Sequence, residues 1–262
     1  MEEVTRSFYC QALTLLTEAS IPVLVGGAYA FGRYTGITRH TKDFDIFIHP
    51  RDVGAVMGVF TKARFQTEIP FPHWIGKAYC GEDFVDVIYS SGNAIAAVDD
   101  LWFEHAVDDE VFGLPVKLVP PEEIIWSKAF IQERERFDGA DVAHVIRACG
   151  TSMDWERLLK RFDSYWRILF QHLVVFGFIY PGEQSRVPAW VMRAMIRRLE
   201  DEVAHPPADE HLCRGTVLSR QQYLPDITTW GYVDLRTLPE NPMTEEHIAI
   251  WTAGIAIDGA GH

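Results

Sequence analysis

The segment from Asp43 to Ile48, Asp-Phe-Asp-Ile-Phe-Ile, places the strongest constraint on how this chain folds. Charged and apolar residues alternate at its start, and side chains two positions apart on a strand lie on one face about 7 Å apart. On a strand, Asp43 and Asp45 therefore project together, and the apolar side chains between and after them face the other way. The segment predicts a strand with two neighbouring carboxylates on one face.

Two adjacent carboxylates in an otherwise apolar strand are costly unless a positive charge neutralises them. Hard divalent cations provide that charge, and Mg²⁺ prefers one or two carboxylates together with substrate phosphate oxygens. The alternative is a strand at a sheet edge whose two acids are solvated. The Asp43 and Asp45 pair alone leaves both interpretations open.

Two other segments favour the cation site. Residues 23–28, Val-Leu-Val-Gly-Gly-Ala, have the pattern of a strand, a Gly26-Gly27 turn and a helix start, where backbone N–H groups can bind a phosphate. A Gly-Gly pair is most often only a tight turn. Residues 84–88 place a single carboxylate, Asp86, in an otherwise apolar strand, where a buried Asp needs a partner. If the two Asp-bearing strands pair, three acids converge on one face and could share a metal ion.

Periodicity predicts the remaining elements and the division of the chain. Helices are expected over residues 3–18 and 28–34 and from 50 to 60, and strands over residues 22–25, 43–48, 74–80 and 84–89. Pro120-Pro121 marks a boundary. Beyond it, helices are expected over 122–147 with a break near 138–139, over 155–178 and over 189–203. We assign three parts, 1–119, a helical part 120–205, and an irregular C-terminal extension 206–262.

Composition excludes several classes of protein. The 262 residues carry a formal net charge of −13, which argues against a nucleic-acid coat or a polybasic membrane binder. The four cysteines form no CxxC pair, which fits a reducing cytosol. The first twenty residues lack the pattern of a secretory signal, and the longest apolar run is too short to span a bilayer. We expect a cytoplasmic protein without a membrane partner.

Several catalytic patterns are missing from the sequence. The ten histidines show no HExxH spacing of a zinc enzyme, and the serines show no GxSxG elbow of a hydrolase. The Gly26-Gly27 segment matches neither GxGxxG nor a P-loop, which argues against Rossmann and P-loop proteins.

Together, these motifs resemble the nucleotidyltransferase superfamily that shares the polymerase-beta-type palm. Gly26-Gly27 followed by residues 39–45, Arg-His-Thr-Lys-Asp-Phe-Asp, is similar to the branch that contains lincosamide nucleotidyltransferases and AbiEii-type toxins. The resemblance covers roughly residues 22–90 and continues through residues 119–141. The sequence departs from the family where Gly27 replaces a frequent Ser, and where the gap from Gly27 to Asp43 is longer than in the tightest members.

The resemblance implies an α+β fold, a palm-like mixed sheet with helices over residues 1–119, followed by a mostly helical second domain that closes the cleft. It implies transfer of a nucleoside monophosphate from an NTP to a hydroxyl-type acceptor with release of pyrophosphate. Two Mg²⁺ ions, or Mn²⁺, would be held by the catalytic residues Asp43, Asp45 and Asp86, and Asp86 could also accept the proton of the acceptor. The nucleotide-binding residues would be Gly26, Gly27, Arg39, Thr41 and Lys128.

Some of these assignments have competing interpretations. Arg39 could be a plain loop cation and Lys128 a surface lysine, while Asp138 and Asp141 would fix the helical packing. The net charge favours a small-molecule or protein acceptor over tRNA. We expect a small-molecule acceptor, with a toxin-like activity on RNA or protein as the alternative. A non-catalytic nucleotide-binding scaffold is the rival from another class, and the presence of all three carboxylates argues against it.

Overall fold

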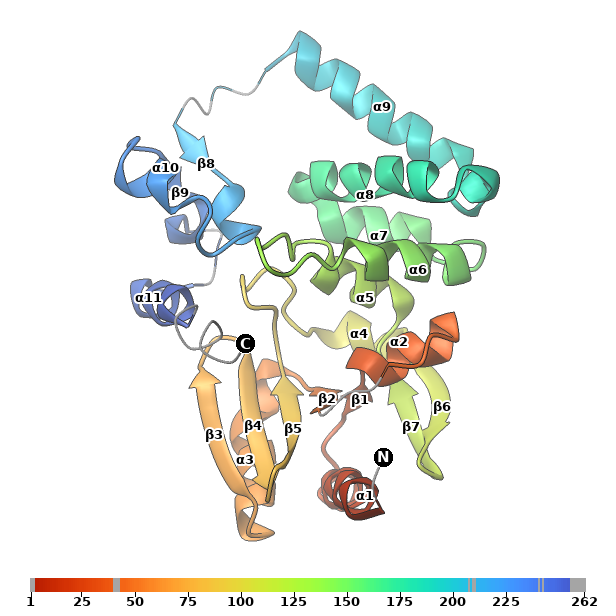
Figure 1. Cartoon of the computed structure of the whole chain (residues 1–262), viewed down its shortest axis with the longest axis vertical. Helices are drawn as coiled ribbons and strands as arrows, with labels where there is room; N and C mark the ends of the chain where they lie inside the picture. Colours follow the sequence, from red (N-terminus) through yellow and green to blue (C-terminus); the bar gives the residue numbers. More distant parts are fainter. Residues whose placement is uncertain are drawn as a thin grey trace. The chain divides into compact units, whose positions relative to one another are not determined.

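The computed structural model describes residues 3–39, 43–206, 208, 211–239, 241 and 243–254. The chain divides into two compact units, one ending at Pro120 and the other beginning at Pro121. Figure 1 shows the elements of both units in sequence colours. Each unit is described by itself.

Unit 1 is built on a mixed sheet that has seven strands within the described residues, in the order β3-β4-β5-β2-β1-β7-β6 (Figure 1). The strands are β1 (Leu24–Val25), β2 (Asp43–Phe47), β3 (Gln66–Phe71), β4 (Ile75–Cys80), β5 (Asp83–Ile88), β6 (Val107–Val111) and β7 (Leu114–Leu118). The pairs β2–β5 and β1–β7 are parallel, and the other neighbours are antiparallel. The Asp-bearing strand β2 is therefore the middle strand of the sheet and does not lie at an edge.

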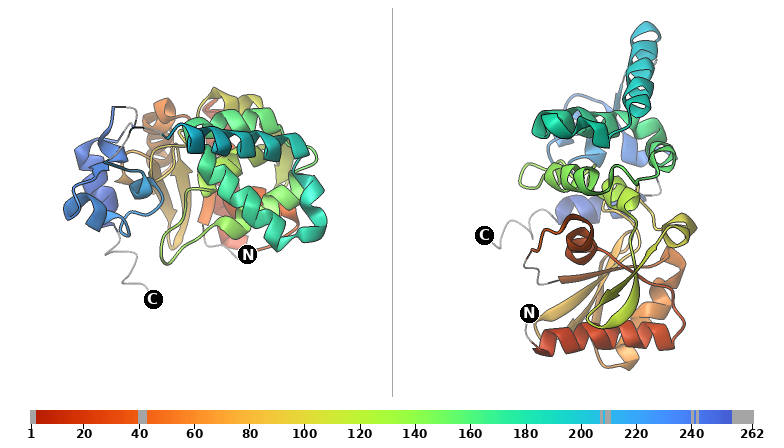
Figure 2. Two further views of the ribbon diagram at one scale, coloured as in Figure 1. Left: turned by 90° about the horizontal axis from the view of Figure 1, so that it is seen from above. Right: turned by 90° about the vertical axis from the view of Figure 1, so that its right-hand side faces the viewer.

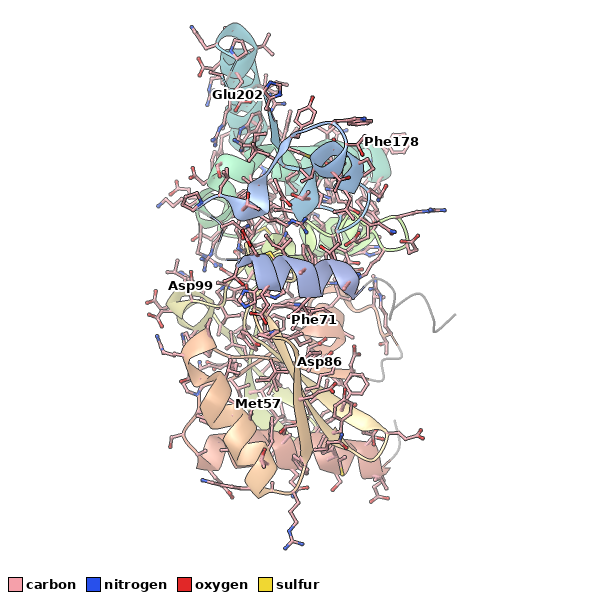
Figure 3. The ribbon with its side chains drawn as sticks, turned by 90° about the vertical axis from the view of Figure 1, so that its left-hand side faces the viewer. Met57, Phe71, Asp86, Asp99, Phe178 and Glu202 are labelled. Carbon is pink, nitrogen blue, oxygen red and sulfur yellow. The ribbon has the colours of Figure 1, made fainter. Side chains whose placement is uncertain are left out.

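The helices of unit 1 are α1 (Glu3–Glu18), α2 (Gly27–Thr35), α3 (Val53–Lys62), which follows a 3₁₀ turn at Pro50–Asp52, and α4 (Asp100–Glu104). Tyr9 of α1 stacks on Phe44 of β2, with ring centroids 4.9 Å apart. Met57 of α3, labelled in Figure 3, packs where Gly76 of β4 has no side chain to exclude it, because a Cβ atom at Gly76 would lie 3.2 Å from the Met57 side chain. Figure 2 shows α1 lying across the strands. Because Phe44 and Gly76 share one face in the strand register, α1 and α3 cover that face, and the alternate residues belong to the other.

Unit 2 is mostly helical. It contains α5 (Pro121–Lys128), α6 (Gly139–Cys149), α7 (Trp155–Phe162), α8 (Trp166–Ile179), α9 (Ala189–Ala204), α10 (Leu224–Thr228) and α11 (Glu245–Ala253), with the short strands β8 (Leu212–Cys213) and β9 (Val233–Asp234) and 3₁₀ turns at Asp163–Tyr165, Pro181–Arg186, Gly215–Val217 and Leu235–Thr237. Arg157 of α7 forms buried ion pairs with Glu122 and Glu123 of α5, which join the two helices. None of the helices in the described ranges is both long and apolar enough to cross a bilayer.

The α+β fold class predicted from the sequence is confirmed. The prediction of one helix over 155–178 is wrong, because α7 ends at Phe162 and the next residue, Asp163, has a φ of 29°, which is outside the helical range. The break expected near 138–139 within residues 122–147 is present, since α6 begins at Gly139, but α5 already ends at Lys128, so residues 129–138 separate the two helices. The segment 206–262, predicted to be irregular, contains α10, α11 and two short strands in its described part.

Candidate functional site

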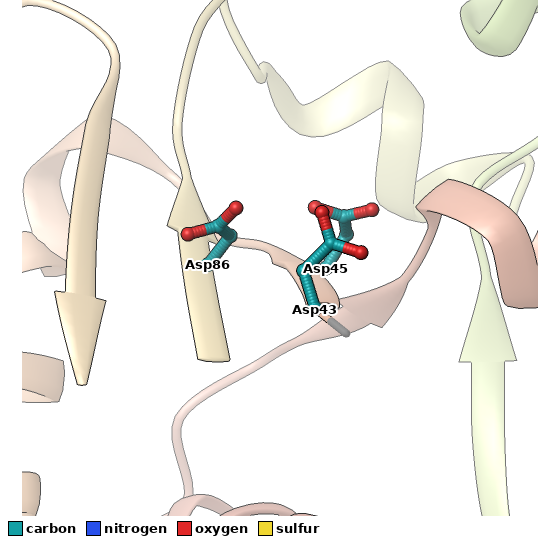
Figure 4. A group of neighbouring side chains, drawn as sticks. All are labelled: Asp43, Asp45 and Asp86. Carbon is teal, nitrogen blue, oxygen red and sulfur yellow. The ribbon is translucent and has the colours of Figure 1, made fainter. Parts of the chain in front are cut away.

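The parallel pairing of β2 with β5 brings three carboxylates together. In this register Asp45 lies opposite Asp86. Asp43 lies two residues before Asp45 on β2, and its side chain therefore lies on the same face of the sheet. Asp43, Asp45 and Asp86 each offer one oxygen, and these three oxygens lie within 4.8 Å of one another (Figure 4). Asp86 is buried, with 7% of its surface exposed, whereas Asp43 and Asp45 are half-buried. The convergence that the sequence predicted for two neighbouring strands is therefore what the strand order produces.

Asp86 has a basic partner that the sequence analysis missed. Lys77 of β4 lies opposite Asp86 in the antiparallel β4–β5 pair, and its Nζ donates a hydrogen bond of 2.6 Å to Asp86 Oδ1. Burial raises the pKa of Asp86 above its ordinary value; the ammonium of Lys77 offsets part of this rise, and the charge of Asp43 adds to it. Asp86 is therefore a stronger base than an exposed carboxylate.

The register that pairs Lys77 with Asp86 follows from counting residues outward from the turn between β4 and β5. Cys80 pairs with Asp83, so a two-residue turn joins β4 to β5, and its first residue, Gly81, has a φ of 66°. Two-residue hairpin turns fix the register of the strands that they join. Three further steps along each strand lead from Cys80 and Asp83 to Lys77 and Asp86.

Gly26 and Gly27 place the start of α2 directly beside Asp45. The Gly26 N–H donates a hydrogen bond of 3.0 Å to the Asp45 carbonyl oxygen. Gly27 has a φ of 52°, and a Cβ atom there would lie 1.6 Å from Asp45 Oδ2. A Cβ atom on Gly26 would lie 2.2 Å from the ring of Phe47. Both positions therefore require glycine, and the positive N-terminal end of α2 lies next to the carboxylate site.

The other predicted nucleotide-binding residues have different surroundings. The Arg39 guanidinium lies 4.4 Å from the centroid of the Phe31 ring. Thr41 lies outside the described residues. In unit 2, Lys128 Nζ lies 2.7 Å from Asp138 Oδ2 and 2.9 Å from Asp141 Oδ2, so it joins the end of α5 to the start of α6.

The donor set at the carboxylate site fits a divalent cation. Three carboxylates from two adjacent strands supply hard oxygen ligands, which are the ligands that Mg²⁺ and Mn²⁺ prefer. No sulfur or imidazole donor belongs to this group of residues, so a soft metal is disfavoured. Asp43, Asp45 and Asp86 could each hold such an ion through one oxygen.

Comparison with known proteins gave matches to solved structures only; no family model and no curated protein matches the chain. The chain is similar to the solution structure of the antibiotic-resistance factor ANT(2'')-Ia, with 17% identity, coverage of 66% of this chain and 98% of that chain, and a TM-score of 0.48. It is also similar to the lincomycin-bound lincosamide antibiotic adenylyltransferase LnuA, with 12% identity, coverage of 55% and 96%, and a TM-score of 0.39.

A nucleotidyltransferase-like protein from Paracoccidioides brasiliensis matches with 16% identity, coverage of 64% of this chain and 91% of that chain, and a TM-score of 0.37. Because these identities and scores are low, we base the assignment of function on the residues of this chain.

Proposed function

We propose that this protein is a divalent-metal-dependent nucleotidyltransferase that transfers a nucleoside monophosphate from an NTP to a hydroxyl group of a small-molecule acceptor. The observation that carries the proposal is the convergence of Asp43, Asp45 and Asp86 within 4.8 Å on two parallel strands. A divalent ion bound there would neutralise the triphosphate charge, which is the main requirement of phosphoryl and nucleotidyl transfer.

The carboxylates have distinct parts in this proposal. Asp43 and Asp45 face solvent more than Asp86 does, so they would hold the ion that carries the nucleotide. In the reaction, the acceptor oxygen forms a bond to the α-phosphorus, and the bond from that phosphorus to the bridging oxygen breaks, which releases pyrophosphate. The proton of the acceptor hydroxyl moves to a carboxylate oxygen of Asp86, whose raised pKa suits a general base.

The start of α2 would bind the triphosphate. Gly26 and Gly27 have no side chains to block it, and the first N–H groups of a helix attract anions. The N-cap residue of this helix is Gly26, which makes no side-chain capping hydrogen bond. The contributions of Arg39, Thr41 and Lys128 stay predictions. Lys128 would have to exchange Asp138 or Asp141 for a phosphate.

The net negative charge of the chain bears on the class of acceptor. A net charge of −13 disfavours a large nucleic-acid surface but permits a nucleotide that arrives with its metal ion. A small molecule meets this condition most simply, and an RNA or protein acceptor is the alternative that an experiment must exclude.

The test is incubation of the protein with each α-labelled NTP, Mg²⁺ and a cell extract, followed by separation of small molecules, RNA and protein. We expect label in a small molecule and release of pyrophosphate. Asp43→Asn and Asp45→Asn should abolish both, and Asp108→Asn is the matched control, because Asp108 is an exposed acid on β6 of the same sheet. Label in RNA or protein would show that the acceptor is a macromolecule and not a small molecule. The absence of label from every fraction would contradict the proposed nucleotidyl transfer.

A further inference from the structure

A row of charged side chains crosses the sheet at the level of the carboxylate site. The strand registers place Glu68 of β3 opposite Lys77 of β4. Lys77 in turn lies opposite Asp86, which lies opposite Asp45. Side chains that are directly opposite each other share a face, so Lys77 is the neighbour of Asp86 on the side away from Asp45.

Two contacts fix the Lys77 side chain in this row. Its Nζ lies 2.6 Å from Asp86 Oδ1 and 4.2 Å from the centroid of the Phe84 ring. Only 23% of the side chain is exposed, in contrast to 52% for Lys117, which forms a similar cross-strand pair with Asp108 at the other end of the sheet. Charge-assisted hydrogen bonds and cation–π contacts are stronger where water is excluded. Lys77 is therefore held in place, whereas Lys117 belongs to an ordinary surface pair.

This contact divides the two oxygens of Asp86 between two neighbours. Oδ1 accepts the hydrogen bond from Lys77 on the β4 side. Figure 4 shows one oxygen of Asp86 on the side of Asp43 and Asp45 and the other turned away from them. Oδ2 is thus the oxygen that Asp86 has left for a metal ion or an acceptor proton.

We propose that Lys77 is a positioning residue of the carboxylate site, which restricts Asp86 to a single available oxygen and weakens the attraction of the three carboxylates for a divalent ion. This inference rests on the proposed function. Its physical basis is that a fixed ammonium group beside one carboxylate repels a cation that approaches the same carboxylate. Lys77 thereby lowers the affinity of the site for a metal ion and fixes the orientation of the Asp86 carboxylate.

The test measures Mn²⁺ binding without nucleotide, by calorimetry and by the electron paramagnetic resonance signal of free Mn²⁺. Lys77→Met should bind Mn²⁺ about tenfold more tightly than the parent, because the repelling charge is gone. The same variant should have a lower kcat, because Asp86 has lost its orientation. Lys77→Arg keeps the charge and should restore the parental Mn²⁺ affinity, and Lys117→Met is the matched control.

The outcomes separate this inference from the proposed function. In an Asp86→Asn background, Lys77→Met should no longer lower kcat further, since the carboxylate that Lys77 orients is missing. A loss of packing alone would weaken or preserve Mn²⁺ binding, so unchanged or weaker binding by Lys77→Met would overturn the inference while leaving the proposed function intact. If the parent protein binds no Mn²⁺, both proposals fail.

Discussion

Replacement of Gly27 by alanine is the most direct test of how the start of α2 and the carboxylate site depend on each other. The new Cβ atom would lie 1.6 Å from Asp45 Oδ2, 2.5 Å from its Cγ and 2.8 Å from its Cβ. Since ordinary contact begins near 3.4 Å, Oδ2 would have to move by about 1.8 Å, the difference between these distances. Rotation of the carboxylate alone is not sufficient, because the Asp45 Cβ is also too close.

The cost of this substitution has two parts. A non-glycine residue at positive φ costs roughly 1–2 kcal/mol, and forcing atoms into occupied space costs about 1–3 kcal/mol more. We therefore expect Gly27→Ala to lower the free energy of unfolding by about 2–5 kcal/mol. Gly36→Ala is the matched control. Gly36 ends the same helix with a φ of 73°, but nothing lies within 4 Å of the position that its Cβ atom would occupy, so only the first part of the cost applies.

The decisive measurement is function per folded molecule. We expect Gly27→Ala to lose about 100-fold in nucleotidyl transfer, because displacement of a positioned group by more than 1 Å costs about that much. Mn²⁺ binding should weaken in parallel, whereas Gly36→Ala should keep parental transfer and Mn²⁺ affinity at a reduced melting temperature. Parental transfer and Mn²⁺ binding by folded Gly27→Ala would refute the packing of Gly27 against Asp45.

Two further predictions concern unit 2 and the cysteines. Burial raises the pKa of Asp138, but the ion pairs with Arg136 and Lys128 outweigh this effect, so the pKa in the folded protein is below the ordinary value. Lys128→Met should therefore destabilise the protein at pH 7. The difference in melting temperature between the variant and the parent should shrink as the pH falls below about 4, where Asp138 becomes protonated. A difference that persists at low pH would contradict this ion pair. Burial raises the pKa of the Cys149 thiol to about 11, whereas Cys80 is exposed. At pH 8, mass spectrometry of the folded protein treated with iodoacetamide should therefore find Cys80 modified and Cys149 unmodified. Modification of Cys149 at the same rate as Cys80 would contradict the burial of Cys149.

The elements that carry strong apolar patterns were predictable from the sequence. Residues 3–18 and 189–203 appear as α1 and α9 with nearly the predicted bounds, and the Asp-bearing strands β2 and β5 were expected at their observed places. The sequence analysis gave their pairing only as a condition and did not predict its parallel direction, because alternation shows which residues share a face but not which strand lies beside it.

The strands that were missed lack that signal. β6 has the sequence Val-Asp-Asp-Glu-Val and is mostly exposed, and β3 and β7 each contain a proline. Prolines and consecutive acids are tolerated in strands near sheet edges, but in the sequence alone they are typical of loops. Lys77 was missed for a related reason, since its importance depends on the register of a hairpin and not on its local sequence.

The acidic composition of β6 has a consequence for association between molecules. β3 and β6 are the two edges of the sheet within the described residues, and an edge strand offers unpaired backbone groups to strands of other chains. The consecutive acids Asp108, Asp109 and Glu110 outnumber their ion-pair partners, Lys117 and Arg33, so two copies of the β6 edge carry net charge of the same sign. Edge-to-edge pairing of β6 between copies is therefore opposed by repulsion, so part of the excess negative charge of this protein serves as protection against aggregation.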